Sequence, residues 1–322
     1  NSIIIIRHFL FIEIHNYLNK KKIIYVTTPI INKNNAEGAG EVFKITTLNY
    51  LNNKNLSEDL FKGKARLTVS GQLELESAMY GLGNVYSFGP VFRADNSNTL
   101  KHLSEFWMLE IELIFSKLKN IIKLSINLIK YLFKRTLKYC YNEIIYLEKY
   151  NKKKIINRLK KIIKNKFIKI SYNKIIKLLK KNDKNIIKWG QDIGSNHEKI
   201  IFNKILKNDL PIIIYNYPSK IKPFYMRKYK NKKITKSIDI LFPGIGEIIG
   251  GSERETNYYQ LYKNIKKKKM NIKNIMWYIN LRKLGKIYHS GFGLGFDRLL
   301  QFITGIKNIR DIVPFPIYPR HI

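Results

Sequence analysis

Residues 85–115 read VYSFGPVFRADNSNTLKHLSEFWMLEIELIF, and this stretch decides the fold class. Its two ends, residues 85–93 and 106–115, are apolar runs of a length that is typical of strands. The residues between them, 94–104, are mostly polar and predict a connecting loop. The stretch therefore predicts a pair of neighbouring strands with a polar loop that carries basic side chains at one end.

The second of these strands has two different faces, because side chains alternate along a strand. Its apolar face contains Trp107, Leu109, Ile111 and Leu113. Its other face contains Met108, Glu110 and Glu112. Two acidic residues on one face indicate either a concave, hydrated side of a sheet or an ordinary solvent-facing side.

The same patterns extend to both sides of this stretch. Further strands are expected at residues 23–26, 67–69, 212–214, 224–227 and 238–242, and helices at residues 3–18 and 72–80. Strands outnumber crossover helices and follow one another too closely for βαβ units. The sequence therefore predicts an α+β domain with an antiparallel sheet.

Composition limits the classes of protein to consider. The chain has 322 residues, a formal net charge of +37 and a single cysteine, Cys140. One cysteine excludes a disulfide framework and a cysteine-based zinc site. The apolar stretch at residues 3–17 is interrupted by charged side chains, so no membrane span is expected. We expect a cytoplasmic location, with an organelle as the alternative.

The positive charge has two explanations. Lysine occurs 49 times and arginine only 11 times, and isoleucine and asparagine are also abundant. An AT-rich coding sequence raises the frequencies of lysine, isoleucine and asparagine together, whereas selection for phosphate binding would not raise the frequency of isoleucine. Whatever its origin, the charge attracts polyanions such as RNA.

Residues 117–181 differ from the rest, because their only acidic residues are Glu143 and Glu148. Apolar residues recur there at helical spacing. We therefore expect a helical insertion, rich in Lys, Ile and Asn, over about residues 117–188 of one domain that spans residues 1–322.

Three segments could carry chemistry, each with a plainer alternative. Residues 88–107 place Arg93, Lys101 and His102 where they could bind a polyphosphate, although a lone histidine is usually a surface residue. Residues 243–255, PGIGEIIGGSERE, place Glu247 among glycines, where it could hold Mg²⁺; a glycine-rich hairpin is the alternative.

The third segment, residues 291–298, reads GFGLGFDR. Its alternate glycines would let a flat ring approach the backbone, and Arg298 is expected in the first turn of a following helix. A simple tight turn is the alternative. The segment matches neither a phosphate-binding Walker loop nor a dinucleotide-binding fingerprint.

Taken together, the three segments resemble the class II aminoacyl-tRNA synthetases, and among them the asparaginyl-tRNA synthetases. Residues 93–107 resemble motif 2 of that family, residues 293–298 resemble motif 3, and the helix and strand that end at Pro29 resemble motif 1. Further matching pieces, in family order, are residues 35–41, 68–73, 189–192, 216–218, 222–227 and 309–316.

The resemblance implies a six- or seven-stranded antiparallel sheet flanked by helices, and a homodimer. It also implies a ligase that joins L-asparagine to tRNA(Asn). Asparagine and ATP, bound with Mg²⁺, form asparaginyl-adenylate and pyrophosphate, and the 3′ end of tRNA(Asn) then takes the aminoacyl group. Neither DNA nor a membrane is an implied partner.

The resemblance also assigns site residues. It implies catalytic roles for Arg93 and Arg298. Implied ATP-binding residues are Arg93, Asp95, Lys101, His102, Leu103, Glu247, Gly293, Gly295, Asp297 and Arg298. Implied amino-acid-binding residues are Glu37, Ser70, Gln72 and Arg254, and the implied metal site comprises Glu247 and Gly250.

The chain departs from the family pattern at three positions. Asp95 and Asp297 stand where glutamate is usual, and Lys101 stands where arginine is usual. Each change shortens a contact or removes a forked donor. The anticodon-reading β-barrel of the family is expected to be absent from residues 1–322.

Three alternatives remain. The first is an asparagine synthetase-like paralogue, which would amidate aspartyl-adenylate. The second is an aspartate-specific tRNA synthetase, whose amino-acid pocket would differ in one contact. The third is a decayed synthetase domain, a relic that binds RNA without catalysis.

Overall fold

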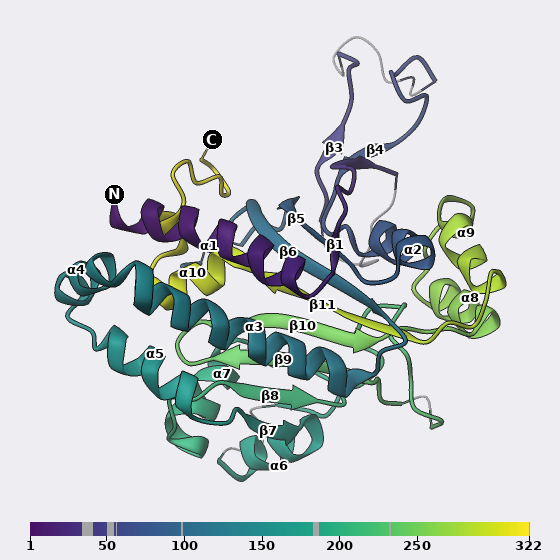
Figure 1. Cartoon of the computed structure of the whole chain (residues 1–322). Helices are drawn as coiled ribbons and strands as arrows, with labels where there is room; N and C mark the ends of the chain where they lie inside the picture. Colours follow the sequence, from purple (N-terminus) through teal and green to yellow (C-terminus); the bar gives the residue numbers. More distant parts are fainter. Residues whose placement is uncertain are drawn as a thin grey trace.

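The structure is a computed structural model, and it describes residues 1–33, 41–49, 55, 57–97, 99–182, 187–231 and 233–321. Its centre is an eight-stranded sheet (Figure 1). In spatial order the strands are β1 (Ile24–Tyr25), β5 (Val85–Phe92), β6 (Glu105–Ile114), β11 (His289–Gly295), β10 (Gly246–Glu253), β9 (Ser237–Phe242), β8 (Ile212–Tyr215) and β7 (Ile168–Ser171).

The six strands from β5 to β8 are antiparallel, whereas the two short edge strands run parallel to their neighbours. The α+β class and the antiparallel core predicted from the sequence are therefore confirmed. The strand count differs slightly, because two edge strands, β1 and β7, extend the sheet in the parallel sense.

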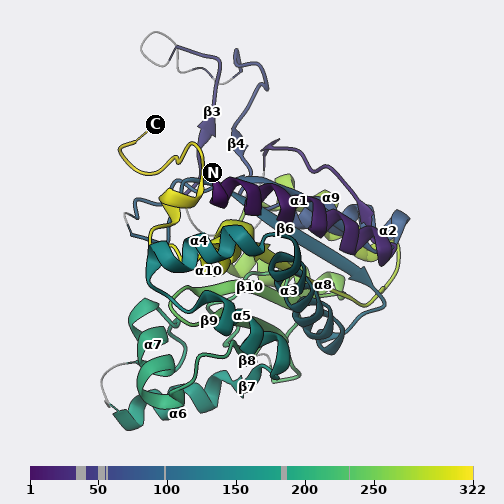
Figure 2. The ribbon, with the colours of Figure 1, turned by 60° about the vertical axis from the view of Figure 1, so that its left-hand side comes forward.

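One face of the sheet is covered by helices (Figures 1 and 2). They are α1 (Ser2–Lys20), α3 (Leu118–Tyr139), α4 (Tyr141–Asn151), α5 (Ile155–Lys164) and α10 (Phe296–Thr304). Their apolar stripes and the apolar face of β6 form the largest core, which includes Leu10, Phe133 and Leu299. The sequence pattern predicted both α1 and the alternation of β6.

The other face is covered only in part. Helices α2 (Gln72–Leu82), α8 (Tyr258–Lys267) and α9 (Ile272–Asn280) and the 3₁₀ turn η2 (Leu281–Lys283) lie at one end of it. Three of these helices contribute Leu73, Leu261 and Ile275 to a separate core cluster. This face also carries Glu110 and Glu112 of β6, and both side chains are buried and bonded rather than hydrated.

The segment expected to be a helical insertion contains helices α3, α4, α5 and α6 (Tyr172–Asn182) and also strand β7. The helical pattern did not predict β7, which pairs with β8 and extends the main sheet. Helix α7 (Ser195–Ile200) and the π-helical turn η1 (Ile201–Leu206) follow and pack with α6 against this edge.

A small sheet of β2 (Ile31–Asn32), β4 (Ala65–Leu67) and β3 (Lys44–Ile45) projects from the main body (Figure 1). The strand predicted at residues 67–69 is thus observed two residues earlier. The C-terminal segment, predicted to be a proline-rich loop, contains a short 3₁₀ turn, η3 (Ile309–Ile312).

One predicted strand and one of the alternatives for a glycine-rich segment are wrong. Residues 224–227 form no strand, because the segment begins with a turn in which the Met226 amide donates to the Pro223 carbonyl, and only Met226 bridges to Arg254. Residues 291–295 are not a tight turn but part of β11. Gly291 is needed in the sheet, because a Cβ at this position would overlap the Glu112 carboxylate.

None of the helices in the described part of the chain combines the length and the apolar character that crossing a membrane requires.

Candidate active site

A cleft of about 330 Å³ opens on the face of the sheet that carries Glu110. The structure brings together in it every described residue that the sequence singled out. These are Ser70, Gln72, Arg93, Asp95, Lys101, His102, Leu103, Glu247, Gly250, Arg254, Gly293, Gly295, Asp297 and Arg298. Glu37 lies outside the described residues.

One side of the cleft is rich in cations. Arg93 follows β5 directly, and its backbone amide donates to the Ser104 carbonyl at 2.8 Å, which closes the base of the polar loop. Arg298, in the first turn of α10, donates from Nη1 to the Glu247 carbonyl at 2.9 Å. Burial lowers the pKa of Arg298, and the neighbouring charge of Arg93 adds to this effect. Such converging cations suit a polyanionic ligand.

His102 lies beside these cations. Its Nδ1 is within hydrogen-bond distance of the Thr99 and Ser97 hydroxyls, at 2.5 and 3.2 Å. Burial, followed by the charges of Arg298 and Arg93, lowers the pKa of His102, so the imidazole is neutral at pH 7. It can therefore offer a hydrogen bond but no charge.

Lys101 has a partner that the sequence did not reveal. Its Nζ lies 3.3 Å from Oε2 of Glu198 in α7, and both side chains are largely buried. The two residues are 97 positions apart, so no local pattern could have linked them.

Glu247 and Asp239 approach each other from the adjacent strands β10 and β9. A Cβ built on Gly250 would lie 2.7 Å from Oε1 of Glu247 and 3.7 Å from Oδ1 of Asp239, so the glycine leaves room for both carboxylates. Asp239 also accepts two hydrogen bonds from Lys222 Nζ, at 2.6 and 2.7 Å. Burial, together with the charge of Glu247, raises the pKa of Asp239 to about 7.

The opposite end of the cleft is built around Arg254. Its Nη2 donates to Gln72 Oε1 at 2.7 Å and to Glu112 Oε1 at 2.5 Å. Its Nε donates to the other Glu112 oxygen at 3.2 Å, and Nη1 donates to the Ser252 hydroxyl at 2.7 Å. Four hydrogen bonds fix the plane of the guanidinium, and the remaining Nη1 hydrogen can meet one ligand oxygen.

Ser70 and Glu110 complete this end. The Ser70 hydroxyl donates to Glu110, and the Gly71 amide donates to the other Glu110 oxygen at 2.7 Å. Of the two interpretations of the acidic face of β6, the concave side fits Glu110, which lines the cleft.

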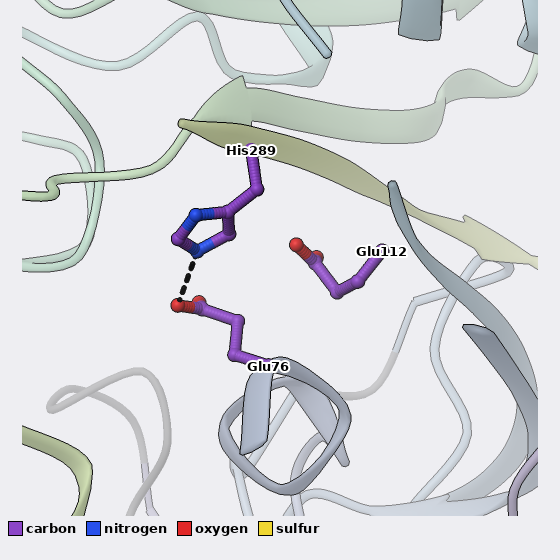
Figure 3. Close-up of side chains that lie close together, drawn as sticks. All are labelled: Glu76, Glu112 and His289. Atoms are coloured by element: carbon purple, nitrogen blue, oxygen red, sulfur yellow. Dashed lines mark hydrogen bonds and ion pairs between the residues drawn. The ribbon is translucent and has the colours of Figure 1, made fainter. Parts of the chain in front are cut away.

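Behind Arg254 lies a buried ionic network that the sequence analysis missed. Glu76 of α2, Glu112 of β6 and His289 of β11 converge, and His289 lies 3.0 Å from Glu76 (Figure 3). Arg282 Nη2 donates to Glu76 at 2.7 Å. Burial alone would raise the pKa of Glu76, but Arg282 and His289 outweigh it and hold that pKa below its ordinary value.

Three side chains with this spacing could ligate a metal ion. Here, however, Arg254 and Arg282 supply the positive charge that the two carboxylates require. The cluster is thus an ionic support for Arg254.

Asp297 lines the cleft, but its carboxylate is already engaged. One oxygen accepts from Arg7 of α1 at 2.5 Å and the other accepts from the Trp107 amide at 2.7 Å. These contacts join α10 to α1 and to β6, and so hold Arg298 in place.

Comparison with known proteins agrees with this geometry. The model of the class II tRNA synthetases (D, K and N) matches residues 1–319. The asparagine–tRNA ligase of Wigglesworthia glossinidia brevipalpis is 50% identical over 321 residues, which cover 97% of this chain and 68% of that protein. The asparagine–tRNA ligase of Cytophaga hutchinsonii is 42% identical over 325 residues, covering 98% of this chain and 70% of the relative.

A solved structure shows the same fold. The asparaginyl-tRNA synthetase from Pyrococcus horikoshii, solved in complex with asparaginyl-adenylate, superposes with a TM-score of 0.88 at 34% identity. The match covers all of this chain and 69% of that one. The chain therefore belongs to the class II tRNA synthetases of the D, K and N group.

Proposed function

We propose that the chain activates L-asparagine with ATP and transfers it to the 3′ end of tRNA(Asn). The observation that carries this proposal is the convergence in one cleft of a cationic end, with Arg93, Lys101 and Arg298, and an end built around Arg254. The identity of the amino acid and of the tRNA in this proposal comes from relatives named asparagine–tRNA ligase, which match nearly the whole chain.

In the first step the asparagine carboxylate attacks the α-phosphorus of ATP, and pyrophosphate leaves. Arg93 would stabilise the charge that develops on the α-phosphate, and Lys101, His102 and Arg298 would contact the β- and γ-phosphates. Asp95, Leu103, Gly293 and Gly295 would border the nucleotide. The substrate supplies the nucleophile itself, so the protein acts by positioning and by charge stabilisation.

Arg254, Gln72, Ser70 and Glu37 would receive the amino acid. The remaining Nη1 hydrogen of Arg254 suits a single carbonyl oxygen, such as that of a side-chain amide. The neighbouring Glu110 carboxylate lines the same cleft and would attract an amide NH₂ and repel a carboxylate.

We further propose that Mg²⁺ accompanies ATP and that Glu247, beside Gly250, holds it. The carboxylate oxygens of Glu247 and Asp239 both lie within 4 Å of the Cβ position of Gly250, and carboxylate oxygens are the donors that Mg²⁺ prefers. A bound Mg²⁺ would neutralise phosphate charge.

A homodimer is part of the proposal. β1 is at one end of the sheet, and the apolar side chains Ile24, Tyr25, Ile30 and Ile31 near it are each more than 40% exposed. A second copy would cover them. We also propose that residues 117–188 are an insertion into one catalytic domain, since β7 joins the main sheet, and that the enzyme acts in the cytoplasm.

The proposal is tested by charging purified tRNA(Asn) with labelled asparagine, with tRNA(Asp) as the control. We expect label on tRNA(Asn) only. Formation of asparagine from aspartate, ATP and ammonia without tRNA would instead identify the asparagine synthetase-like paralogue. RNA binding without either reaction would identify a non-catalytic relic.

A further inference from the structure

Glu198 lies beside the cationic end of the cleft, where it contacts the lining residue Lys101, although no motif in the sequence points to it. It belongs to α7, which follows the lysine-rich segment, and its side chain is only 12% exposed. A Cβ on Gly246 would overlap the Glu198 carboxylate, so this glycine allows the carboxylate to lie against the start of β10. Glu198 is therefore held beside Glu247 and faces the loop that carries Lys101.

The charges around Glu198 are those expected to bind the triphosphate. Its Oε2 lies 3.3 Å from Lys101 Nζ. Burial raises the pKa of Glu198, whereas Lys101 and Arg298 oppose this shift and Glu247 adds to it. The carboxylate thus contacts the cation-rich end of the cleft through Lys101, to which a phosphate group would also be attracted.

An ammonium has three donors but one charge, and it binds most strongly to the anion that is closest. A phosphate that approaches Lys101 must therefore compete with the Glu198 carboxylate. Glu198 also repels the phosphate directly.

We propose that the Glu198 carboxylate competes with the triphosphate of ATP for Lys101. In the free enzyme the carboxylate forms the ion pair with Lys101, and ATP displaces the carboxylate from Lys101 when it binds. The ion pair between Glu198 and Lys101 would form again as pyrophosphate leaves. Glu198 thus lowers the affinity for ATP and speeds release of pyrophosphate, and it acts as a positioning residue through Lys101. The proposal rests on the proposed function, because it concerns the ATP end of the same cleft.

The variant Glu198→Gln tests it, because glutamine keeps the shape against Gly246 and removes the charge. ATP–pyrophosphate exchange gives the KM of ATP, of pyrophosphate and of asparagine in one assay. We expect the KM values of ATP and pyrophosphate to fall by about three- to tenfold, the range for a partly buried ion pair, while the KM of asparagine is unchanged. A variant with mere structural damage would bind both phosphate ligands more weakly.

Lys101→Met provides the second arm. In the Lys101→Met background, adding Glu198→Gln should change the KM values of ATP and pyrophosphate only slightly, because there is no ammonium for which the carboxylate and the phosphate compete. A full effect of Glu198→Gln without Lys101 would overturn the competition between carboxylate and phosphate. A higher KM for ATP, or a higher Mg²⁺ requirement, in Glu198→Gln itself would also overturn it, and the latter would make Glu198 a metal ligand.

Asp209→Asn is the matched control. It removes one carboxylate from an exposed ion pair with Lys161, at 3.4 Å, outside the cleft. Its KM values should equal those of the wild type. Absence of exchange in the wild-type protein would reject the proposed function, whereas normal wild-type exchange with unchanged KM values in Glu198→Gln would reject only the role of Glu198.

Discussion

Arg254 is a charged side chain that the fold removes almost completely from water, with 2% of its side chain exposed. A buried charge is tolerated only with a close partner, and Glu112 and Gln72 supply the necessary hydrogen bonds. Glu112 is in turn beside Glu76, whose charge is balanced by Arg282. The position of the Arg254 guanidinium therefore depends on Glu76 and Arg282, which do not line the cleft.

Arg93 is in a different situation, since it lines the open part of the cleft and its guanidinium lies 5.5 Å from the Phe106 ring. We expect Arg93→Ala to reduce adenylate formation by roughly 10²–10³-fold or more, because it removes the charge that stabilises the reacting phosphate. ATP–pyrophosphate exchange measures the loss, and circular dichroism checks that the fold is retained. Near-normal exchange in a folded variant would exclude this role.

At the scale of elements, the acidic residue Glu13 connects helix α1 to helix α3 through hydrogen bonds. Glu13 accepts from Arg135 through Nε at 2.7 Å and Nη2 at 2.9 Å, and from the Tyr131 hydroxyl at 2.6 Å. Glu13 is buried, so its charge depends on these donors. The contact fixes α1, and Arg7 of α1 in turn holds Asp297.

The hydrogen bond from Arg135, against the effect of burial, lowers the pKa of Glu13 below its ordinary value of 4.5. A depressed carboxyl pKa stabilises the folded protein above the unfolded-state pKa, and this stabilisation is lost as the pH falls through the folded-state pKa. We expect Glu13→Gln to destabilise the protein by about 1–3 kcal/mol at pH 7. The difference from the wild type should shrink below pH 4.5, as measured by urea unfolding, and a difference independent of pH would contradict this account.

The elements also show what sequence patterns can and cannot predict. Helix α1 and strand β6 follow directly from the spacing of their apolar residues. Strand β7 was missed because its four residues are surrounded by helical patterns and it forms only by pairing with β8. The glycines of β11 resemble a turn in the sequence, and only the structure shows that Glu112 occupies the space that Gly291 leaves.

The residues of the candidate site were predictable from the sequence only in part. Residues such as Arg93, Glu247 and Arg298 stand in recognisable segments, and the fold brings them together. Glu198, Asp239, Glu76, Arg282 and His289 were not predicted as site residues. Their significance lies in contacts between distant segments, as in the ion pair of Lys101 and Glu198, and a single sequence does not show such contacts.

At the scale of the whole molecule, the net charge of +37 is the dominant feature. A protein of this charge releases counterions when it binds RNA, so its affinity depends steeply on salt. We expect tRNA binding by this chain to weaken by at least about tenfold between about 50 and 200 mM salt. Filter binding over a salt series measures this, and tight binding that ignores salt and selects the anticodon would disagree with it.

The central claim is that the cleft activates asparagine. ATP–pyrophosphate exchange with asparagine and with aspartate in parallel tests this claim most directly. We predict exchange that depends on asparagine and is absent with aspartate. The reason is that Arg254 offers a single N–H donor and that Glu110 would repel the side-chain carboxylate of aspartate. Exchange with aspartate alone, or with neither amino acid, would contradict the account.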